Sequence, residues 1–470
     1  GIIILSILSV IWIFTGYLWG KKANNLDGFM LAGRKVGLAL GTATAMATWV
    51  TSNTTMLAPQ FALQLGIWGM LAYATASIGL ILFAPMAKRI KELMPHGITS
   101  GDFILQRYGK KVWFLFLIIS LFYSITWMIS MAMAGGILLQ TLSGIPYIYG
   151  MSVILFVCVS YTLFGGMYAV IGTDFIQSIL ILIGVVVVGF SVLTKINIDS
   201  VYNHIHDKQP ALLMVFLPAA LISLFNNLLF GVGEIFHSNV WWSRAFAMDK
   251  GVGEKAYTLA AIFWFPIPIA AGFIALASGT LSINVTSPDM VGPLIAAKVL
   301  GKVGAIIVFI VIFSSLASSV DSLLAATSDL LTEDVYRRII NPKADEKNLK
   351  KVSGIIIVLL GVLTWLFCIP RIGTLATILF FAGPMVGSTI FPILLGLYWK
   401  KANSEGAFWA LILGTVVGLI SYFFIGWYSA SLIGTAISMI VTFLFTFLKP
   451  EDFDWNKLKS LNHSEQENSL

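Results

Sequence analysis

Long apolar runs recur along nearly the whole chain and restrict its fold more than any other feature. Many reach the length of about 18 residues at which an apolar stretch can cross a bilayer as a helix. Only 11% of the residues are charged, whereas soluble domains carry about 25%. We therefore predict an all-α integral membrane protein of about 13 transmembrane helices. The predicted spans are residues 1–18, 38–65, 68–87, 113–139, 146–165, 168–194, 213–236, 256–282, 303–332, 353–369, 373–398, 406–425 and 428–447.

The basic residues predict how these spans are oriented. Lys and Arg total 29, and if the first loop lies inside, the outer side holds only Lys195, Lys208, Lys298, Lys302 and Arg371. Cytoplasmic loops are enriched in Lys and Arg, which places the N-terminus outside and the C-terminus inside. This asymmetry accounts for the net charge of +7 without a nucleic-acid partner. We expect the polar tail at 449–470 to be frayed.

Two predicted spans contain residues that interrupt a helix. In the second, residues 44–55 are mostly small or hydroxyl-bearing and precede Pro59; in the seventh, Asn226 and Asn227 precede Gly231-Val232-Gly233-Glu234. Backbone groups freed by a break are tolerated in a membrane only beside protein or a watery cavity. Broken spans five apart indicate an inverted-repeat transporter with its binding site at the breaks. Two ordinary kinked helices are the alternative, because Gly and Pro are common in membrane helices.

The ninth span carries a face of hydroxyl groups. Ser315, Ser318, Ser319 and Ser322 follow the spacing i, i+3, i+4 and i+7, and therefore share one side of the helix. Several oxygen atoms held together suit a hard cation such as sodium, and hydroxyls provide them without burying net negative charge. The alternative is a face of small residues that lets helices pack closely, with hydroxyls bonding back to their own helix.

Three carboxylates lie inside predicted spans: Asp174, Glu234 and Asp321. A carboxylate in a bilayer costs about 2.5–3.5 kcal/mol on insertion scales, so each needs a partner. For Asp174, near the inner end of its span, that partner is a cation, an arginine or interfacial water. Glu234 is deeper and is a candidate for contact with a cationic or amide-bearing solute, for holding a proton or for capping a broken helix. Asp321 neighbours the serine face, and we expect it to support packing or the groups around it.

The sequence favours transport over catalysis. It contains no His/Cys cluster with metal-ligand spacing, no nucleophile elbow and no phosphate-binding loop. We expect no catalytic residue, no enzyme activity and no organic cofactor. A membrane channel or a solute sensor is the rival of a different class. A sensor usually carries a cytoplasmic signalling domain, for which the tail at 449–470 is too short.

Four short motifs follow one another along the chain. They are Phe29-Met30-Leu31-Ala32-Gly33-Arg34, Arg107-Tyr108-Gly109, Tyr161-Thr162-Leu163-Phe164-Gly165-Gly166 followed by Thr173-Asp174, and Thr332-Glu333-Asp334-Val335-Tyr336. In their order and spacing they resemble the sodium/solute symporter family, which includes the proline, sialic acid and sodium/glucose symporters. The resemblance covers essentially the whole chain. Residues 161–174 and Trp241-Trp242-Ser243-Arg244 are loosely similar to the urea and polyamine branch.

This resemblance implies a LeuT-type core of two inverted five-helix repeats. The core would occupy residues 38–398, with repeats at 38–194 and 213–398. Residues 1–37 would form a first peripheral helix and a cytoplasmic loop, residues 399–448 two further peripheral helices, and residues 449–470 a cytoplasmic tail.

The resemblance also implies site residues. The main sodium site would lie between the second and ninth spans and use Ala47, Val50, Ser315, Ser318 and Ser319. Some family members bind a second sodium ion, for which the matching residues are Asp174, Ser315, Ser318 and Ser319. The substrate pocket would include Thr54, Tyr73, Gly231 and Glu234. Glu234 stands where the sugar branch has a gating tyrosine, and Thr54 falls near that branch's sugar-binding glutamine, which disfavours a sugar.

These patterns together predict a sodium-coupled secondary active symporter that imports a small polar organic solute by alternating access. Its partners would be that solute, sodium as the coupling ion and the lipid bilayer of the plasma (inner) membrane, with the protein a monomer or weak oligomer. A proton-coupled transporter of an amine or amide, with Glu234 or Asp174 titrating, is the alternative within the same class.

Overall fold

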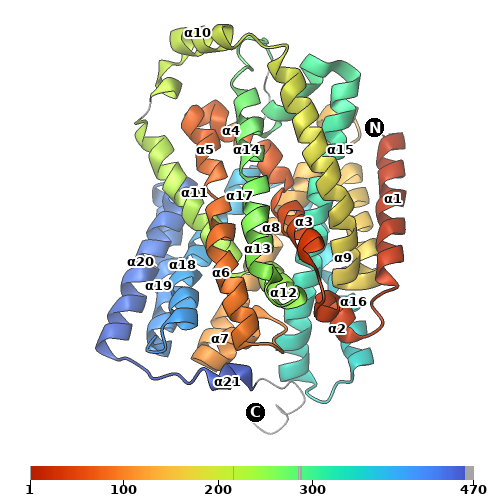
Figure 1. Cartoon of the computed structure of the whole chain (residues 1–470). Helices are drawn as coiled ribbons and strands as arrows, with labels where there is room; N and C mark the ends of the chain where they lie inside the picture. Colours follow the sequence, from red (N-terminus) through yellow and green to blue (C-terminus); the bar gives the residue numbers. More distant parts are fainter. Residues whose placement is uncertain (1, 215, 284, 286–287, 461–470) are drawn as a thin grey trace.

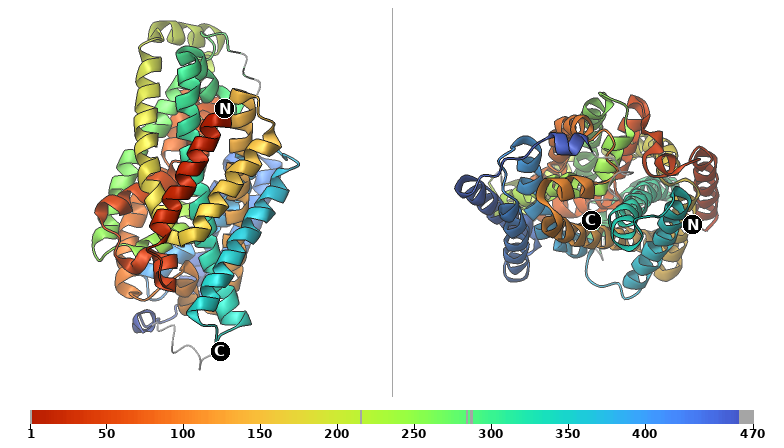
Figure 2. Two further views of the ribbon diagram at one scale, coloured as in Figure 1. Left: turned by 90° about the vertical axis from the view of Figure 1, so that its right-hand side faces the viewer. Right: turned by 90° about the horizontal axis from the view of Figure 1, so that it is seen from below.

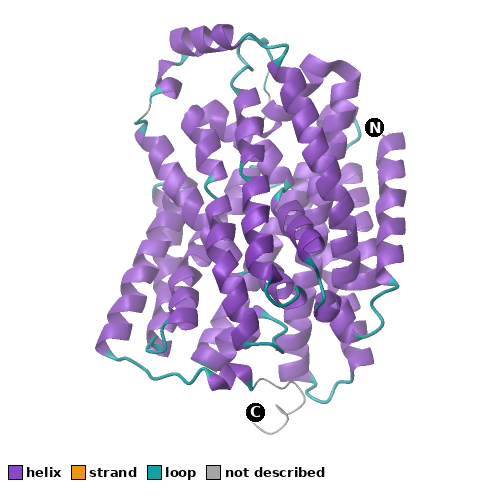
Figure 3. Cartoon of the chain, viewed as in Figure 1, coloured by secondary structure: helices purple, strands orange, loops and turns teal. Residues whose placement is uncertain are grey.

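The protein is a bundle of helices (Figures 1 and 3). The structure is a computed structural model that describes residues 2–214, 216–283, 285 and 288–460. Throughout these residues the regular elements are helical, and one isolated bridge joins Val36 to Met248. The first half comprises α1 (Ile2–Gly20), α2 (Leu26–Leu31), η1 (Ala32–Arg34), α3 (Leu38–Trp49), α4 (Ser52–Leu65), α5 (Ile67–Ala74), α6 (Ser77–Leu93), α7 (Ser100–Tyr108), α8 (Lys110–Ser143), α9 (Tyr147–Leu193), α10 (Ile198–Lys208) and η2 (Pro210–Leu213). The second half comprises α11 (Pro218–His237), α12 (Asn239–Ala247), α13 (Val252–Trp264), α14 (Pro266–Ala275), η3 (Pro288–Met290), α15 (Val291–Leu330), the π-helical η4 (Leu331–Ile340), α16 (Glu346–Cys368), α17 (Leu375–Phe381), α18 (Gly383–Tyr398), α19 (Ser404–Phe424), α20 (Trp427–Leu448) and α21 (Asn456–Lys459).

The apolar segments fall on the predicted spans. Within the described residues, 11 segments are long and apolar enough to cross a membrane. The predicted number differs at two places. First, α9 covers two predicted spans and changes direction at Gly166, where φ is 50° and ψ is −131°. Second, the predicted span 38–65 is divided into α3 and α4, of 12 and 14 residues, each shorter than a full span. The number of 13 stays a prediction.

The peripheral helices flank a central group. Helices α1 and α20 lie on opposite sides of the bundle, both from the side and from below (Figures 1 and 2). Between them, α15 packs against α9, α8, α4 and α3, so the serine face of the ninth span is enclosed by protein. Helix α10 lies at one end of the bundle and α21 at the other (Figure 1). The orientation with the N-terminus outside stays a prediction.

The second span breaks within the predicted stretch, which confirms that expectation. Helix α3 ends at Trp49, and Val50 and Thr51 are non-helical, with ψ values of 83° and 168°. The Thr51 hydroxyl accepts a hydrogen bond from the backbone N–H of Thr54 at 3.1 Å, and so caps the start of α4. The last carbonyls of α3 have lost their continuing helix and are free to bond elsewhere.

In the seventh span the predicted position of the break is wrong. Residues 231–234 are helical within α11, and the chain leaves the helix at Ser238, whose ψ is 128°. The glycines serve close packing instead: a Cβ on Gly231 would stand 2.8 Å from the Cα of Ala76 on the loop before α6. Small residues are a common means of bringing membrane helices together. A short helix, α12, follows the true break.

The expectation of a frayed tail is wrong for residues 449–460. Helix α21 packs on α6 and α7, and Leu458 is fully buried. The rings of Trp455 and Phe453 lie 5.0 and 4.5 Å from the guanidinium carbons of Arg89 and Arg107. Burial of the Leu458 side chain and the two cation–π contacts therefore stabilise the packing of residues 449–460 against the bundle. Residues 461–470 lie outside the described residues.

Buried ion pairs join α7 to η4. The guanidinium of Arg338 pairs with the carboxylates of Asp102 and Asp334. Asp334 also accepts hydrogen bonds from the Thr99 hydroxyl at 2.6 Å and the Trp113 indole N–H at 2.8 Å. These contacts tie the end of the ninth span to the loop helix between α6 and α8.

Candidate ion and solute sites

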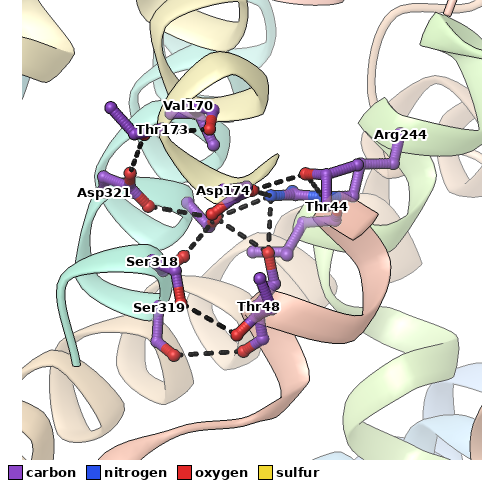
Figure 4. A network of polar contacts seen from close by, with 12 residues as sticks. Thr44, Thr48, Val170, Thr173, Asp174, Arg244, Ser318, Ser319 and Asp321 are labelled. Atoms are coloured by element: carbon purple, nitrogen blue, oxygen red, sulfur yellow. Dashed lines mark hydrogen bonds and ion pairs between the residues drawn. The ribbon is translucent and has the colours of Figure 1, made fainter. Parts of the chain in front are cut away.

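The serine face of α15 meets the broken end of α3. The Ser318 hydroxyl lies 2.8 Å from the carbonyl oxygen of Ala47 and 3.0 Å from that of Ser315. The Ser319 hydroxyl lies 3.1 Å from the carbonyl oxygen of Thr48 and 2.9 Å from that of Ser315. Figure 4 shows Ser318 and Ser319 facing Thr48. We call the five oxygens, which belong to Ala47, Thr48, Ser315, Ser318 and Ser319, the ion cradle.

The ion cradle has more acceptors than donors. Each serine hydroxyl has one proton and can donate it to only one of its two neighbouring carbonyls at a time. A cation placed among the oxygens would contact all of them together, which is the preference of a hard cation. The chemistry of the cluster therefore fits sodium, and the assignment of sodium to it stays a prediction.

Four of the five predicted main-site residues are brought together here: Ala47, Ser315, Ser318 and Ser319. Val50 is buried at the break, and its N–H donates to the carbonyl of Met46 at 2.9 Å. The carbonyl that meets Ser319 is that of Thr48. Sequence reasoning missed Thr48. Its position in the last turn before a predicted break was a usable signal, because backbone carbonyls in the last turn of a helix lack helical partners.

Asp174 has a different partner from the one expected for a second sodium site. Its Oδ2 accepts a hydrogen bond from the Thr44 hydroxyl at 2.5 Å. The same oxygen forms an ion pair with Arg244 Nη2 at 3.3 Å. Its Oδ1 has no hydrogen-bond partner among the described residues. Asp174 is fully buried, so interfacial water is not what compensates it. Asp321 lies nearby, where its Oδ2 accepts a hydrogen bond from Thr173 at 3.3 Å (Figure 4).

A second cluster forms a small cavity next to the same break, which we call the solute cavity. Its volume is about 10 Å³ when measured as the space open to the centre of a water molecule, enough for about one water. Of the predicted substrate residues, Tyr73 and Glu234 line it, whereas Thr54 and Gly231 do not. The Thr54 hydroxyl instead reaches the Trp49 carbonyl at 3.2 Å. The lining residues are Trp49, Thr51, Tyr73, Ala76, Trp127, Asn227, Phe230, Glu234, Trp264 and Leu379.

Aromatic rings form the walls of the solute cavity. The centroid of the Trp49 ring lies 5.9 Å from the centroid of the Trp127 ring and 5.8 Å from that of the Trp264 ring. The ring of Tyr73 stacks on Trp264 at 6.2 Å. The Trp264 indole N–H donates to the Trp49 carbonyl at 2.6 Å, which fixes this wall to the helix break.

Unpartnered polar atoms in this lining give it both hydrogen-bonding roles. Among the described residues, the indole nitrogens of Trp49 and Trp127 and the Oε2 atom of Glu234 are buried and have no hydrogen-bond partner. The Glu234 carboxyl group lies near the Tyr123 hydroxyl. Buried polar atoms are rarely left unpaired. All three atoms belong to residues that line the cavity and are candidates to bind an occupant that reaches them.

Comparison with known proteins decides the family. The sequence model described as "Sodium:solute symporter family" matches residues 29–414. This chain belongs to that family. As a family member it is a multi-pass membrane transporter that moves a solute by symport, and not an enzyme.

The relatives of this symporter include carriers of different solutes. It is 26% identical to the urea active transporter of Saccharomyces cerevisiae, over 98% of this chain and 70% of that protein. It is 24% identical to the urea-proton symporter of Oryza sativa subsp. japonica, over 96% of this chain and 70% of that protein. It is 27% identical to the osmoregulated proline transporter of Bacillus subtilis, over 89% of this chain and 88% of that protein.

Solved structures confirm the predicted LeuT-type fold of the symporter. A sodium-coupled sialic acid symporter in a substrate-bound, outward-open state superposes with a TM-score of 0.78 at 18% identity, over 96% of this chain and 98% of that one. Mhp1, a nucleobase-cation-symport-1 family transporter, superposes with a TM-score of 0.58 at 15% identity, over 93% of this chain and 97% of that one.

Sequence reasoning missed Arg244 as a residue of this symporter's centre. The charge asymmetry predicts that Arg244 belongs to an inner loop, and this is wrong, because Arg244 is 0% exposed within α12. The available signal was its setting between Trp242 and Phe246, which is unusual for a solvated arginine. The aromatic walls of the solute cavity were also missed, since Trp127 and Trp264 lie on helices without any other site residue.

Proposed function

We propose that this symporter uses sodium to import a small, flat, polar solute with amide-type or amine-type N–H groups, across the plasma membrane. The observation that carries the proposal is the position of Trp49 at the end of α3. Its two preceding residues, Ala47 and Thr48, give carbonyls to the ion cradle, and its own ring lines the solute cavity. The C-terminal end of α3 would therefore contact both the sodium ion and the solute.

The lining of the solute cavity supports the solute class. An amide such as urea carries a carbonyl acceptor and N–H donors, and the residues that line the cavity include two tryptophans with unpartnered indole N–H groups and one carboxylate. Flat aromatic walls suit a flat solute. Two of the relatives quoted above are named for urea, which agrees with this chemistry. A sugar needs more hydroxyl-directed partners than this cavity provides.

The proposed cycle follows from the shared helix end. Sodium in the ion cradle would hold α3 against α15 and complete the solute cavity beside the break. After the core rocks, sodium leaves to the low internal concentration and the solute follows. Coupling requires only that both ligands favour the same conformations. The breaks at Val50–Thr51 and at Ser238 support inverted repeats at 38–194 and 213–398.

The driving force is sufficient for accumulation. One positive charge crossing about 100 mV supplies about 2.3 kcal/mol. A tenfold sodium gradient adds about 1.4 kcal/mol. One sodium ion per cycle thus supports an accumulation of about 500-fold for a neutral solute.

Uptake by purified protein in liposomes tests the proposal. Radiolabelled urea, proline, putrescine and glucose would each be offered with an inward sodium gradient and, separately, with potassium in place of sodium. We expect sodium-dependent accumulation of urea or putrescine above the level in protein-free liposomes. Equal uptake in sodium and potassium would contradict sodium coupling, and accumulation of glucose alone would contradict the solute class.

Proton coupling is the second candidate, favoured by one specific observation. The Oε2 atom of Glu234 is buried and has no partner among the described residues, so a proton there would relieve a costly charge. One relative is named a urea-proton symporter. Uptake driven by an inward pH gradient in sodium-free liposomes would support this reading over sodium coupling.

A further inference from the structure

A groove lies between the start of α8 and the start of α19, and we call it the interfacial groove. Its volume is about 980 Å³ when measured as the space open to the centre of a water molecule, and its walls include Lys110, Lys111, Glu405 and Glu451. Both helices are long and apolar enough to cross a membrane, α8 from Lys110 and α19 from Ser404. The groove therefore lies where two spans enter the bilayer, at the level of the lipid headgroups.

The deeper part of the interfacial groove is aromatic. Phe114 on α8 and Trp409 on α19 both line it, and they are 59% and 40% exposed. They follow the first residues of their helices by four and five positions, which places them about 6–8 Å further into the bilayer. Phe408 packs edge to face on Trp409, with the ring centroids 5.5 Å apart. Exposed aromatic rings at this depth are typical of the membrane interface, so this part of the groove suits an acyl chain.

The lysines at the shallow end of the groove are available to bind an anion. Lys110 and Lys111 are exposed, and within the described residues their ammonium groups form no ion pair or hydrogen bond. Each ammonium group carries three N–H donors, and lysine is a common phosphate ligand. Lysines at the ends of membrane helices extend toward the headgroups while their methylene stems cover apolar surface. The two lysines therefore suit the phosphate of a lipid.

The other wall of the groove carries carboxylates. Glu451 accepts hydrogen bonds from the Ser404 backbone N–H at 3.0 Å and from the Ser404 hydroxyl at 2.7 Å, which hold it at the start of α19. A carboxylate has about four acceptor positions, so Glu451 can accept a further donor. Glu405 pairs with Lys449 at 3.6 Å, but both side chains are more than half exposed, so this pair is weak. This wall therefore suits a cation that has N–H groups.

The charges of the interfacial groove distinguish between lipid headgroups. The two lysines and two glutamates of its lining sum to zero, so a headgroup with one negative and one positive group is more complementary than an anionic headgroup. Phosphatidylethanolamine carries a phosphate and a primary ammonium. Phosphatidylcholine has the same phosphate, but its trimethylammonium group has no N–H donor. Phosphatidylglycerol has no positive group for the glutamates.

We propose that the interfacial groove binds a molecule of phosphatidylethanolamine, with its phosphate on the two lysines, its ammonium on the two glutamates and an acyl chain along the aromatic rings. The bound lipid joins α8, in the predicted transport core, to the peripheral helix α19. This inference is independent of the proposed sodium coupling and of the solute class.

Native mass spectrometry of the purified protein in detergent tests this inference without sodium or solute. The protein would be mixed with equal amounts of phosphatidylethanolamine, phosphatidylcholine and phosphatidylglycerol that have the same acyl chains. We expect the first lipid bound to be phosphatidylethanolamine, with a preference of about three- to tenfold over each of the others, as for two exposed ion pairs. Equal binding of the three lipids, or a preference for either of the other two, would overturn the inference.

Variants assign the two ends of the headgroup. Lys110→Gln with Lys111→Gln should weaken binding of all three lipids, because all three carry the phosphate. Glu405→Gln should reduce the preference for phosphatidylethanolamine over phosphatidylcholine and leave binding of phosphatidylcholine unchanged. Lys343→Gln with Lys347→Gln is the matched control, because both lysines are exposed beside the start of α16 and outside the groove lining. Unchanged lipid binding in the Lys110 and Lys111 double variant would overturn the inference, and if that protein does not fold, the lipid preference of the wild type still decides.

Discussion

The hydroxyl of Ser318 donates a hydrogen bond to the carbonyl oxygen of Ala47 at 2.8 Å, across 271 residues of sequence. This contact joins the middle of α15 to the last turn of α3, one step before the helix breaks. The carbonyl is available because α3 stops at Trp49 and leaves its last acceptors without helical partners. A hydroxyl and a carbonyl that meet in this way can exchange their mutual bond for a shared cation.

Loss of both cradle hydroxyls should abolish coupling. In Ser318→Ala with Ser319→Ala, we expect no sodium-dependent uptake in liposomes, because two of the five oxygens of the ion cradle are removed. The protein should still insert and fold, since both serines also sit in a helix that tolerates alanine well. Ser328→Ala, a buried serine on the same helix that bonds Ala325, is the control and should keep its sodium dependence. Retained sodium dependence in the double variant would remove the site assignment.

Glu234→Gln should weaken solute binding according to the charge of the solute. A hydrogen bond to a carboxylate is worth about 1.5–3 kcal/mol, so loss of the charge should raise the KM for a cationic amine by about 10- to 100-fold. A neutral amide should be affected less, because the glutamine keeps one acceptor. Glu254→Gln is the control, as Glu254 is a half-exposed partner of Lys88 on the surface. Equal KM values for Glu234→Gln and the wild type would show that this carboxylate does not touch the solute.

Trp127→Phe should test the indole N–H in the solute cavity. The change keeps an aromatic wall and removes a donor that has no partner among the described residues. If the donor binds the solute carbonyl, the KM for urea should rise by about 2- to 10-fold, as expected for one hydrogen bond. Trp12→Phe on α1 removes a comparably buried and unpartnered N–H far from the cavity, and its KM should be unchanged. The same KM in both variants would count against this role.

Arg338→Ala should destabilise the fold much more than Arg337→Ala. Arg338 pairs with two fully buried carboxylates, and removing one partner of a buried ion pair costs about 3–5 kcal/mol. Arg337 pairs with the Glu333 carboxylate at 3.2 Å while 24% of the Arg337 side chain is exposed, so solvent can replace part of this contact and its loss should cost less. Thermal unfolding of the purified proteins in detergent would measure the difference. Similar melting temperatures for the two variants would contradict the structural importance of the Arg338 network.

The spans and the serine face could be predicted because their signals are local. A run of apolar residues is sufficient to define a membrane helix, and a spacing of three and four residues is sufficient to place Ser315, Ser318 and Ser319 on one side of it. The break near Ala47 was also readable, since small and hydroxyl residues accumulate before Pro59. The break in α11 was misplaced because a glycine looks the same in sequence whether it ends a helix or lets Ala76 approach.

The sequence by itself determined the membrane class, the helices, the hydroxyl face and the presence of intramembrane carboxylates, because each depends on neighbours within a few residues. Only the tertiary structure decided that Thr48 rather than Val50 meets Ser319, that Asp174 pairs with Arg244, and that tryptophans from three helices line the same cavity as Glu234. These contacts join residues far apart in the chain, and they depend on where helices cross and which charges must be balanced away from water. No local pattern contains that information.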